Sequence, residues 1–256
     1  MSSPAEFYHS LPPIIKFYGT TCLLLTTVER LGLVSGMLLY FSPELAFKKL
    51  QLWRAVTNFF FLGTFSMNFA IQLIMLARYG VQLERSFVST GQFVWMMVVS
   101  ALTLLGIATV FPSLNFWFMG SVLVFMLVYL WSREFPNASV SMLGLVTIQG
   151  FYVPWAMLFI NTMFGGSFLH DLLGIVMGHL YHFLTVLYPR SGGRDFLRAP
   201  RFVHKLLAKY GIIHSVPRQP DRSSRPQPQA ESPPSAPPSA AEGTAFRGRS
   251  YRLNRD

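Results

Sequence analysis

The stretch GQFVWMMVVSALTLLGIATVF, residues 91–111, is followed by Pro112-Ser113 and then by LNFWFMGSVLVFMLVYLW, residues 114–131. Neither run contains a charged residue, and each has close to the roughly 20 apolar residues that a helix needs to cross a bilayer. A proline between two such runs ends the first helix and separates it from the second. The sequence therefore predicts two consecutive membrane spans.

Apolar runs of similar length flank this pair on both sides. They cover residues 14–33, 65–83, 143–163 and 168–188. Charges are few in them and lie mostly near the ends, as Glu29 and Arg30 do in the first run. Together with the central pair they predict an all-α membrane domain of six transmembrane helices over residues 1–205.

The composition excludes an ordinary soluble protein. Of the 256 residues, 52% are hydrophobic and 12% are charged, whereas an average soluble domain has about 25% charged residues. Residues 189–256 hold thirteen Lys or Arg and five Asp or Glu, so this tail carries +8 of the net charge of +10. A basic tail on a nearly neutral apolar body indicates an anionic membrane surface rather than nucleic acid. Cys22 is the one cysteine, which excludes an intramolecular disulfide and a Cys/His zinc site.

The long connection between the first two runs has structure of its own. It contains Lys48, Lys49 and Arg54 but also the apolar cluster 59–61. It is too charged to cross a bilayer and too apolar for a solvated loop, so we expect an amphipathic segment in the headgroup region. Most Lys and Arg residues near the span ends lie on the side of the N-terminus, which predicts that both termini are cytosolic.

The chain after the last apolar run changes character twice. Residues 206–245 are rich in proline and polar residues, which predicts a disordered linker. Residues 246–253 bring back apolar side chains at both ends of a basic stretch. A flexible spacer that ends in such anchors is typical of a short linear motif that binds a soluble partner; by spacing alone, a tail end without function is the alternative.

The side chains that could carry chemistry lie mainly in the last apolar run. Asp171 costs about 3 kcal/mol in an apolar span if it faces lipid, so it should face the protein interior or water. Gly174 and Gly178 form a small-xxx-small pair that allows close helix packing. His179 and His182 share a helix face, but no third ligand lies within a turn of them, so a metal site is not expected.

These stretches resemble the Derlin family. The resemblance rests on QLWR (51–54) with NFFF (58–61), on MLVYLWSR (126–133) and on DLLGIVMGHLY (171–181), and it covers most of residues 7–205. Derlins are rhomboid-like proteins of the endoplasmic reticulum membrane that lack protease activity and serve the retrotranslocation of misfolded proteins.

The resemblance implies roles for particular residues. Trp53 and Arg54 match the Trp-Arg motif of the lumenal first loop, and Gly174 and Gly178 match the motif that packs helix six. The tail resembles the motif by which Derlins bind the valosin-containing AAA+ ATPase, through Phe246, Gly248, Ser250, Arg252 and Leu253. Ser250 stands where the family has glycine. Further partners implied are a membrane RING ubiquitin ligase, misfolded clients, lipids and other Derlin copies.

Two other functions compete with this interpretation. An active rhomboid protease needs Gly-x-Ser-Gly in span four and a histidine at the position of Asp171; Gly120-Ser121 has no second glycine after the serine, and His170 is one residue away. A transporter could use Asp171 and the histidines as a proton path, but no inverted repeat is visible. We therefore expect no catalysis and no cofactor.

A mechanism follows as a hypothesis. Asp171 and Asn161 could hold water inside the bilayer. Spans interrupted by Gly150 and Pro154 match the thickness of the hydrocarbon layer poorly, and the surrounding lipid thins in response. A thinner and wetter path lowers the cost of moving a polar chain across. No Gly-x-x-x-x-Gly-Lys-Ser/Thr pattern is present, so the work would come from an ATPase held by the tail.

Overall fold

The computed structural model describes residues 4–112, 117–142, 144, 146–192, 197 and 199–209. The chain divides into two units, Met1–Pro217 and Arg218–Asp256, and all described residues belong to the first. The predicted tail motif, residues 246–253, and nearly all of the predicted linker lie outside the described residues.

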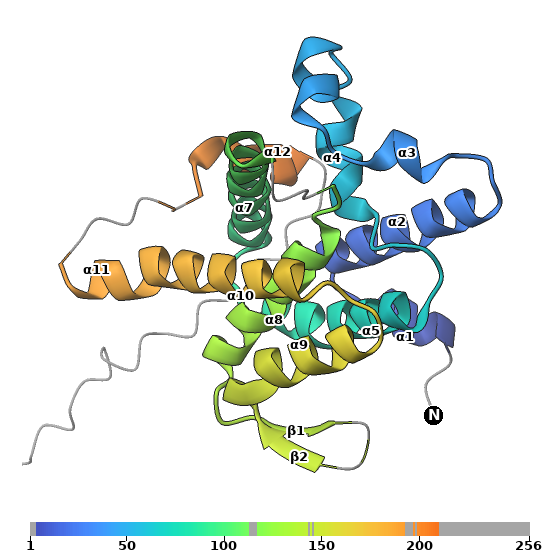
Figure 1. The fold of residues 1–256 in the computed structure, drawn as a ribbon. Coiled ribbons are helices and arrows are strands. Elements are labelled where there is room, and N and C mark those ends of the chain that lie inside the picture. Colours follow the sequence, from blue (N-terminus) through green and yellow to red (C-terminus); the bar gives the residue numbers. More distant parts are fainter. Residues whose placement is uncertain are drawn as a thin grey trace, which may run out of the picture. The chain divides into compact units, whose positions relative to one another are not determined.

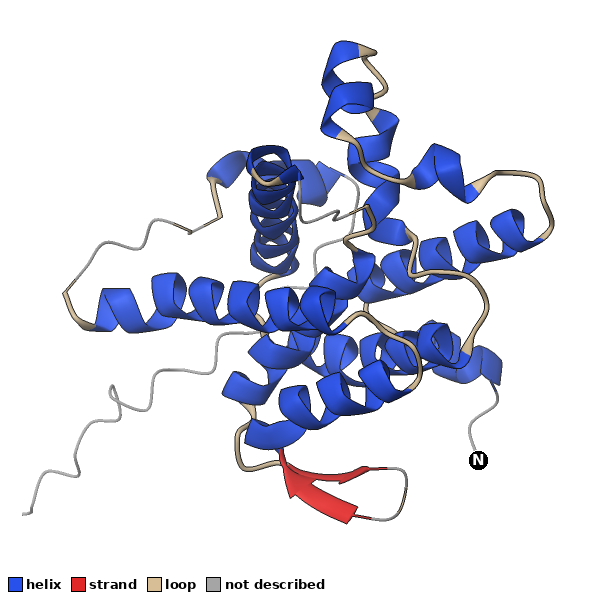
Figure 2. Ribbon diagram, in the orientation of Figure 1, coloured by secondary structure: helices blue, strands red, loops and turns tan. Residues whose placement is uncertain are grey.

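The described part consists mostly of helices (Figures 1 and 2). In chain order they are α1 (Pro4–Ser10), α2 (Pro13–Arg30), α3 (Gly36–Leu39), η1 (Glu44–Lys48), α4 (Trp53–Phe60), α5 (Met67–Met75), η2 (Leu76–Gly80), α6 (Val81–Ser86), α7 (Thr90–Val110), α8 (Gly120–Glu134), η4 (Gly150–Tyr152), α9 (Val153–Met163), α10 (Phe168–His182), η5 (Phe183–Leu187), α11 (Tyr188–Arg190) and α12 (Arg201–Lys209). A hairpin of β1 (Ser139–Met142) and β2 (Val146–Gln149) lies between α8 and η4.

Two helical runs in the described part are long and apolar enough to cross a membrane. They are α7, Thr90–Val110, and the run Phe168–Arg190 formed by α10, η5 and α11. In the most apolar part of each run, 28% of the residues are buried, so most of their surface is available to lipid. These runs agree with the predicted spans 91–111 and 168–188; the total of six spans remains a prediction.

The prediction of one helix over residues 143–163 is wrong. β1 pairs with β2 in antiparallel register, with Val140 opposite Ile148, and α9 begins only at Val153. Branched side chains in both strands favour the extended conformation. The backbone at Gly150 passes so close to the carbonyl oxygen of Phe135 that a Cβ would collide with it. This close approach therefore requires glycine. The described fold is therefore mostly helical rather than all-α.

Helix α8 forms the centre of the first unit. Every residue from Val122 to Ser132 is buried, so the helix is surrounded on all sides. Helices α9 and α10 and the turn η2 pack against it (Figure 1). The helix begins at Gly120 and ends at Glu134, later at both ends than the predicted run 114–131.

Side chains define where three helices begin. The Ser66 and Ser89 hydroxyls accept hydrogen bonds from the backbone N–H groups of Phe69 and Gln92, both at 3.2 Å, and so cap α5 and α7. The first turn of α2 is capped from far along the chain: the two carboxylate oxygens of the buried Glu84 accept the N–H groups of Ile14 (3.0 Å) and Ile15 (2.8 Å).

Candidate functional site

Arg54 holds together three parts of the first loop. The side chain is 5% exposed. Its Nη1 donates to the carbonyl oxygens of Met37 (2.6 Å) and Tyr40 (3.2 Å), and its Nε donates to Oε1 of Gln51 (2.6 Å). The guanidinium also lies 4.9 Å from the centre of the Tyr40 ring. The residue types explain the arrangement, because a planar cation with several donors can satisfy several carbonyls at once.

The neighbouring Trp53 is 52% exposed. An exposed indole beside a buried guanidinium is the expected behaviour of an anchor at the membrane interface. The two lysines of the loop, Lys48 and Lys49, are exposed, and Lys48 forms an ion pair with Glu44 at 3.0 Å. The hydrogen bond from Lys48 lowers the pKa of Glu44 below its usual value.

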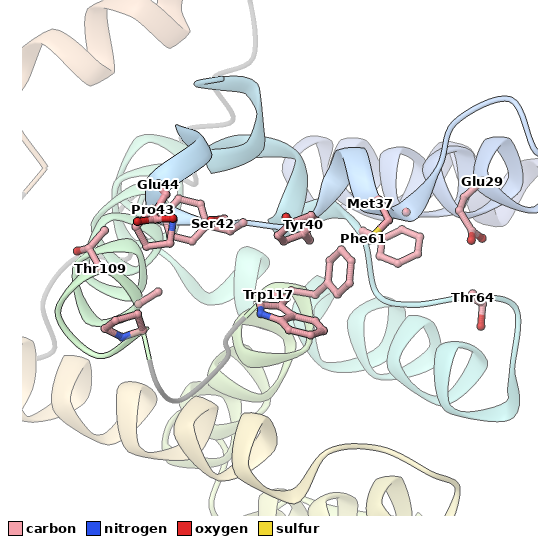
Figure 3. Close-up of a pocket in the computed structure, with 15 residues that line it drawn as sticks. Glu29, Met37, Tyr40, Ser42, Pro43, Glu44, Phe61, Thr64, Thr109 and Trp117 are labelled. Carbon is pink, nitrogen blue, oxygen red and sulfur yellow. The ribbon is translucent and has the colours of Figure 1, made fainter. Parts of the chain in front are cut away.

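A pocket of about 960 Å³ lies beside this loop (Figure 3). Its walls come from the end of α2, the first loop, the end of α7 and the segment that leads into α8. The lining residues include Glu29, Met37, Tyr40, Phe41, Phe61, Thr109, Trp117 and Phe118. The Oε2 atom of Glu29 is buried and has no hydrogen-bond partner among the described residues. A wall that is mostly aromatic, with a few hydroxyl and carboxylate groups such as Ser42, Thr64 and Glu29, suits an extended, mainly apolar ligand.

A buried polar network joins four helices behind the pocket. Asp171 of α10 is fully buried, and its two oxygens accept hydrogen bonds from Ser121 Oγ (2.8 Å) and Asn161 Nδ2 (2.6 Å). Gln72 Nε2 donates to Ser121 Oγ (3.2 Å) and to Asn68 Oδ1 (3.3 Å). The network thus links α5, α8, α9 and α10, and Asp171 faces the protein interior as predicted.

Two acceptors of this network have no partner within the part of the chain that the structure describes. Asn161 Oδ1 and Gln72 Oε1 are buried and lack a hydrogen bond among the described residues. A second pocket of about 150 Å³ borders the network and is lined in part by Asn68, Gln72 and Ser121. Buried polar groups of this kind are normally satisfied by water when a polar space adjoins them.

Two phenylalanines border both pockets. Phe61 and Phe118 line the large pocket and the small one, and their ring centres are 4.9 Å apart. This ring pair therefore stands between the aromatic pocket and the polar network.

Helix α10 approaches α8 through its two glycines. A Cβ at Gly174 would lie 2.6 Å from the carbonyl oxygen of Val122 and 2.6 Å from Cβ of Phe125. A Cβ at Gly178 would lie 2.8 Å from the ring of Tyr129. All three distances are too short for a real methyl group. This geometry is consistent with a packing role for the glycine pair.

The histidines are engaged in separate contacts. His179 Nδ1 lies 2.7 Å from the hydroxyl of Tyr129, and His170 Nδ1 lies 2.7 Å from the hydroxyl of Ser167. Among the described residues no group of three or more His, Cys, Asp or Glu side chains could hold a metal ion. His179 and His182 are therefore not brought together with a third ligand in this part of the chain.

The serine and carboxylate of the protease alternative do meet. The Ser121 hydroxyl donates a hydrogen bond to Asp171 Oδ1 at 2.8 Å. His170 lines the same small pocket as Ser121. A carboxylate is a poor base for activating a serine hydroxyl at neutral pH, and His170 contacts Ser167 instead.

Sequence reasoning missed several residues of the site. Gln72, Asn68 and Trp117 were not singled out, and Glu84 was not recognised as a helix cap. A polar side chain within an apolar run is a usable signal for Asn68 and Gln72. No local signal identifies Trp117 or Glu84, because their contacts join segments far apart in the sequence.

One helix of the buried polar network, α10, belongs to a run long and apolar enough to cross a membrane, and α7 is a second such helix, a pattern typical of helical membrane proteins. The family model for the Der1-like family matches residues 11–201. The chain is 50% identical to Derlin-1 of Arabidopsis thaliana, with 99% of each chain covered. It is 45% identical to Derlin-1 of Oryza sativa subsp. japonica, over 99% of this chain and 100% of the relative. It is 34% identical to Derlin-2.2 of Arabidopsis thaliana, over 83% of this chain and 91% of the relative.

The chain therefore belongs to the Der1-like family and is a Derlin homologue over its full length. This homology implies a membrane component of endoplasmic-reticulum-associated degradation.

Proposed function

We propose that this protein provides a thinned, hydrated path in the endoplasmic reticulum membrane along which misfolded proteins return to the cytosol. The observation that carries the proposal is the network around Asp171, which keeps two unsatisfied acceptors in the interior of a helical membrane domain. Water held there lowers the cost of polar groups that pass nearby.

The length of α9 supports a thinned membrane. This helix has 11 residues, which at 1.5 Å per residue correspond to about 16 Å. The hydrocarbon layer is about 30 Å thick. Lipid next to a short hydrophobic helix thins to match it, so the membrane beside α9 offers the shorter crossing.

The positions of the two pockets indicate the route that a client segment would take. The large pocket lies at the ends of α2 and α7, on the side of the first loop, which the charge distribution assigns to the lumen. An extended apolar client segment fits its aromatic wall. From there the route passes the ring pair of Phe61 and Phe118 to the small pocket and the polar network.

The driving force would come from outside the protein. We propose that residues 246–253 bind the valosin-containing AAA+ ATPase and that residues 206–245 act as the flexible tether. A membrane RING ubiquitin ligase beside the protein would mark the client, and both termini would be cytosolic. Further Derlin copies could complete the path.

Client decay tests the function directly. After protein synthesis is blocked in cells that lack the protein, a misfolded glycoprotein of the endoplasmic reticulum should persist several-fold longer at full length. The re-expressed wild-type chain should restore its decay, whereas a chain that ends at residue 245 should not. If wild-type cells instead produce a membrane-cut client fragment that Ser121→Ala abolishes, the protein is a protease.

Thiol labelling tests the hydrated path. A cysteine reacts with a water-soluble maleimide only as a thiolate, which requires water. We expect Ser121→Cys to react, and to react faster when Phe118→Ala opens the barrier to the large pocket. Cys22 is fully buried and is the one native cysteine, so it supplies the control. A Ser121→Cys chain no more reactive than native Cys22 would contradict a hydrated centre.

A further inference from the structure

Arg133 is held in place by aromatic rings at the end of α8. Its guanidinium carbon lies 4.7 Å from the ring centre of Tyr129, one turn earlier in the helix, and 4.4 Å from that of Phe151 in η4. Stacking on aromatic faces restricts the guanidinium plane but leaves the donors at its edge available.

The charge of Arg133 is not balanced within the described part of the chain. Arg133 forms no ion pair there, and its Nε is buried without a hydrogen-bond partner. Glu134 follows it directly but is exposed, and consecutive side chains point about 100° apart on a helix. A buried guanidinium nitrogen without an acceptor is costly, which indicates that an acceptor from outside the described chain completes the site.

A second basic group lies beside Arg133. The hydroxyl of Tyr129, whose ring Arg133 stacks on, lies 2.7 Å from Nδ1 of His179. The end of α8 and the end of α10 thus each contribute a basic side chain next to this one ring.

We propose that Arg133 binds the phosphate group of an anionic membrane lipid. A guanidinium held flat can donate two parallel hydrogen bonds to a phosphate, which an ammonium cannot. The site lies at the C-terminal end of α8, which the topology predicted from the sequence places at the cytosolic surface, the depth of a lipid headgroup. Basic groups between membrane helices on the cytosolic side are suited to such headgroups.

The test uses the full chain in nanodiscs of phosphatidylcholine with a small fraction of phosphatidic acid. The lipid that remains bound after extraction is identified by mass spectrometry. Wild-type protein should retain phosphatidic acid several-fold above its share of the bilayer, and Arg133→Gln should lose this enrichment. Arg133→Lys should lose most of it, because the charge remains but the paired hydrogen bonds do not.

Arg78→Gln is the matched control. Arg78 is exposed, lies on the same predicted side and contacts one ring, that of Tyr79, at 5.8 Å. It should retain the wild-type enrichment; an equal loss in both variants would show unspecific attraction and overturn the site. Phe151→Leu removes one ring and keeps every charge, so a partial loss is expected even if Arg133→Gln fails to fold. Inorganic phosphate that displaces the lipid at equal concentration would overturn the lipid assignment in favour of a soluble anion.

Discussion

Gly174→Leu is expected to abolish client degradation because it separates α10 from the central helix. The new side chain would start 2.6 Å from the carbonyl oxygen of Val122, a backbone atom that moves only if the whole helix moves. Overpacking of a tight core costs about 1–3 kcal/mol, and we expect the upper end here. Asp171 lies one turn before Gly174, so its hydrogen bond to Ser121 should break as well. Thermal unfolding in detergent and client half-life in cells measure the two effects.

Two variants bracket this result. Gly178→Ala should be milder, because a methyl group is smaller than a leucine side chain and the nearest atoms, Cδ1 (2.8 Å) and Cβ (2.9 Å) of Tyr129, belong to a side chain and not to the backbone. Val176→Leu, on the same helix at a position that is 54% exposed, should behave as wild type. Wild-type stability and client turnover in Gly174→Leu would show that the two helices do not need to touch.

Arg54→Met should disorganise the first loop while leaving the membrane helices intact. Methionine fills a similar volume but donates no hydrogen bond, so the carbonyls of Met37 and Tyr40 and the amide oxygen of Gln51 lose their donor. A fully buried acceptor without a donor costs about 1–3 kcal/mol, and each of these partly buried acceptors should cost less. Because Met37 and Tyr40 line the large pocket, client degradation should fall with it. Limited proteolysis of the loop in opened microsomes reports its order.

The control for charge is Lys49→Gln, since Lys49 is exposed in the same loop. It should leave both protease resistance and client decay unchanged. Arg54→Lys should give a protease resistance and a client decay between those of wild type and of Arg54→Met, because one ammonium cannot reach three acceptors in different directions. A protease-resistant loop in Arg54→Met would mean that the hydrogen bonds of Arg54 do not organise it.

The sequence by itself determined the features that depend on local composition. The runs at 91–111 and 168–188 could be read as membrane helices because length and apolarity are properties of a continuous stretch. The buried position of Asp171 and the close packing at Gly174 also followed, since a charge avoids lipid and a glycine pair permits contact wherever the partner lies. The family could be identified because its motifs are short and continuous.

Tertiary structure alone decided the contacts between distant segments. Residues 143–163 are mostly apolar and carry no charge, and this composition does not distinguish a hairpin followed by a short helix from one continuous span. The partners of Asp171 come from α8 and α9, those of Arg54 from α3 and the turn before α4, and Glu84 caps a helix some 70 residues away. Hydrogen bonds and ring contacts require atoms within a few ångströms, and only the packing of helices brings such atoms together.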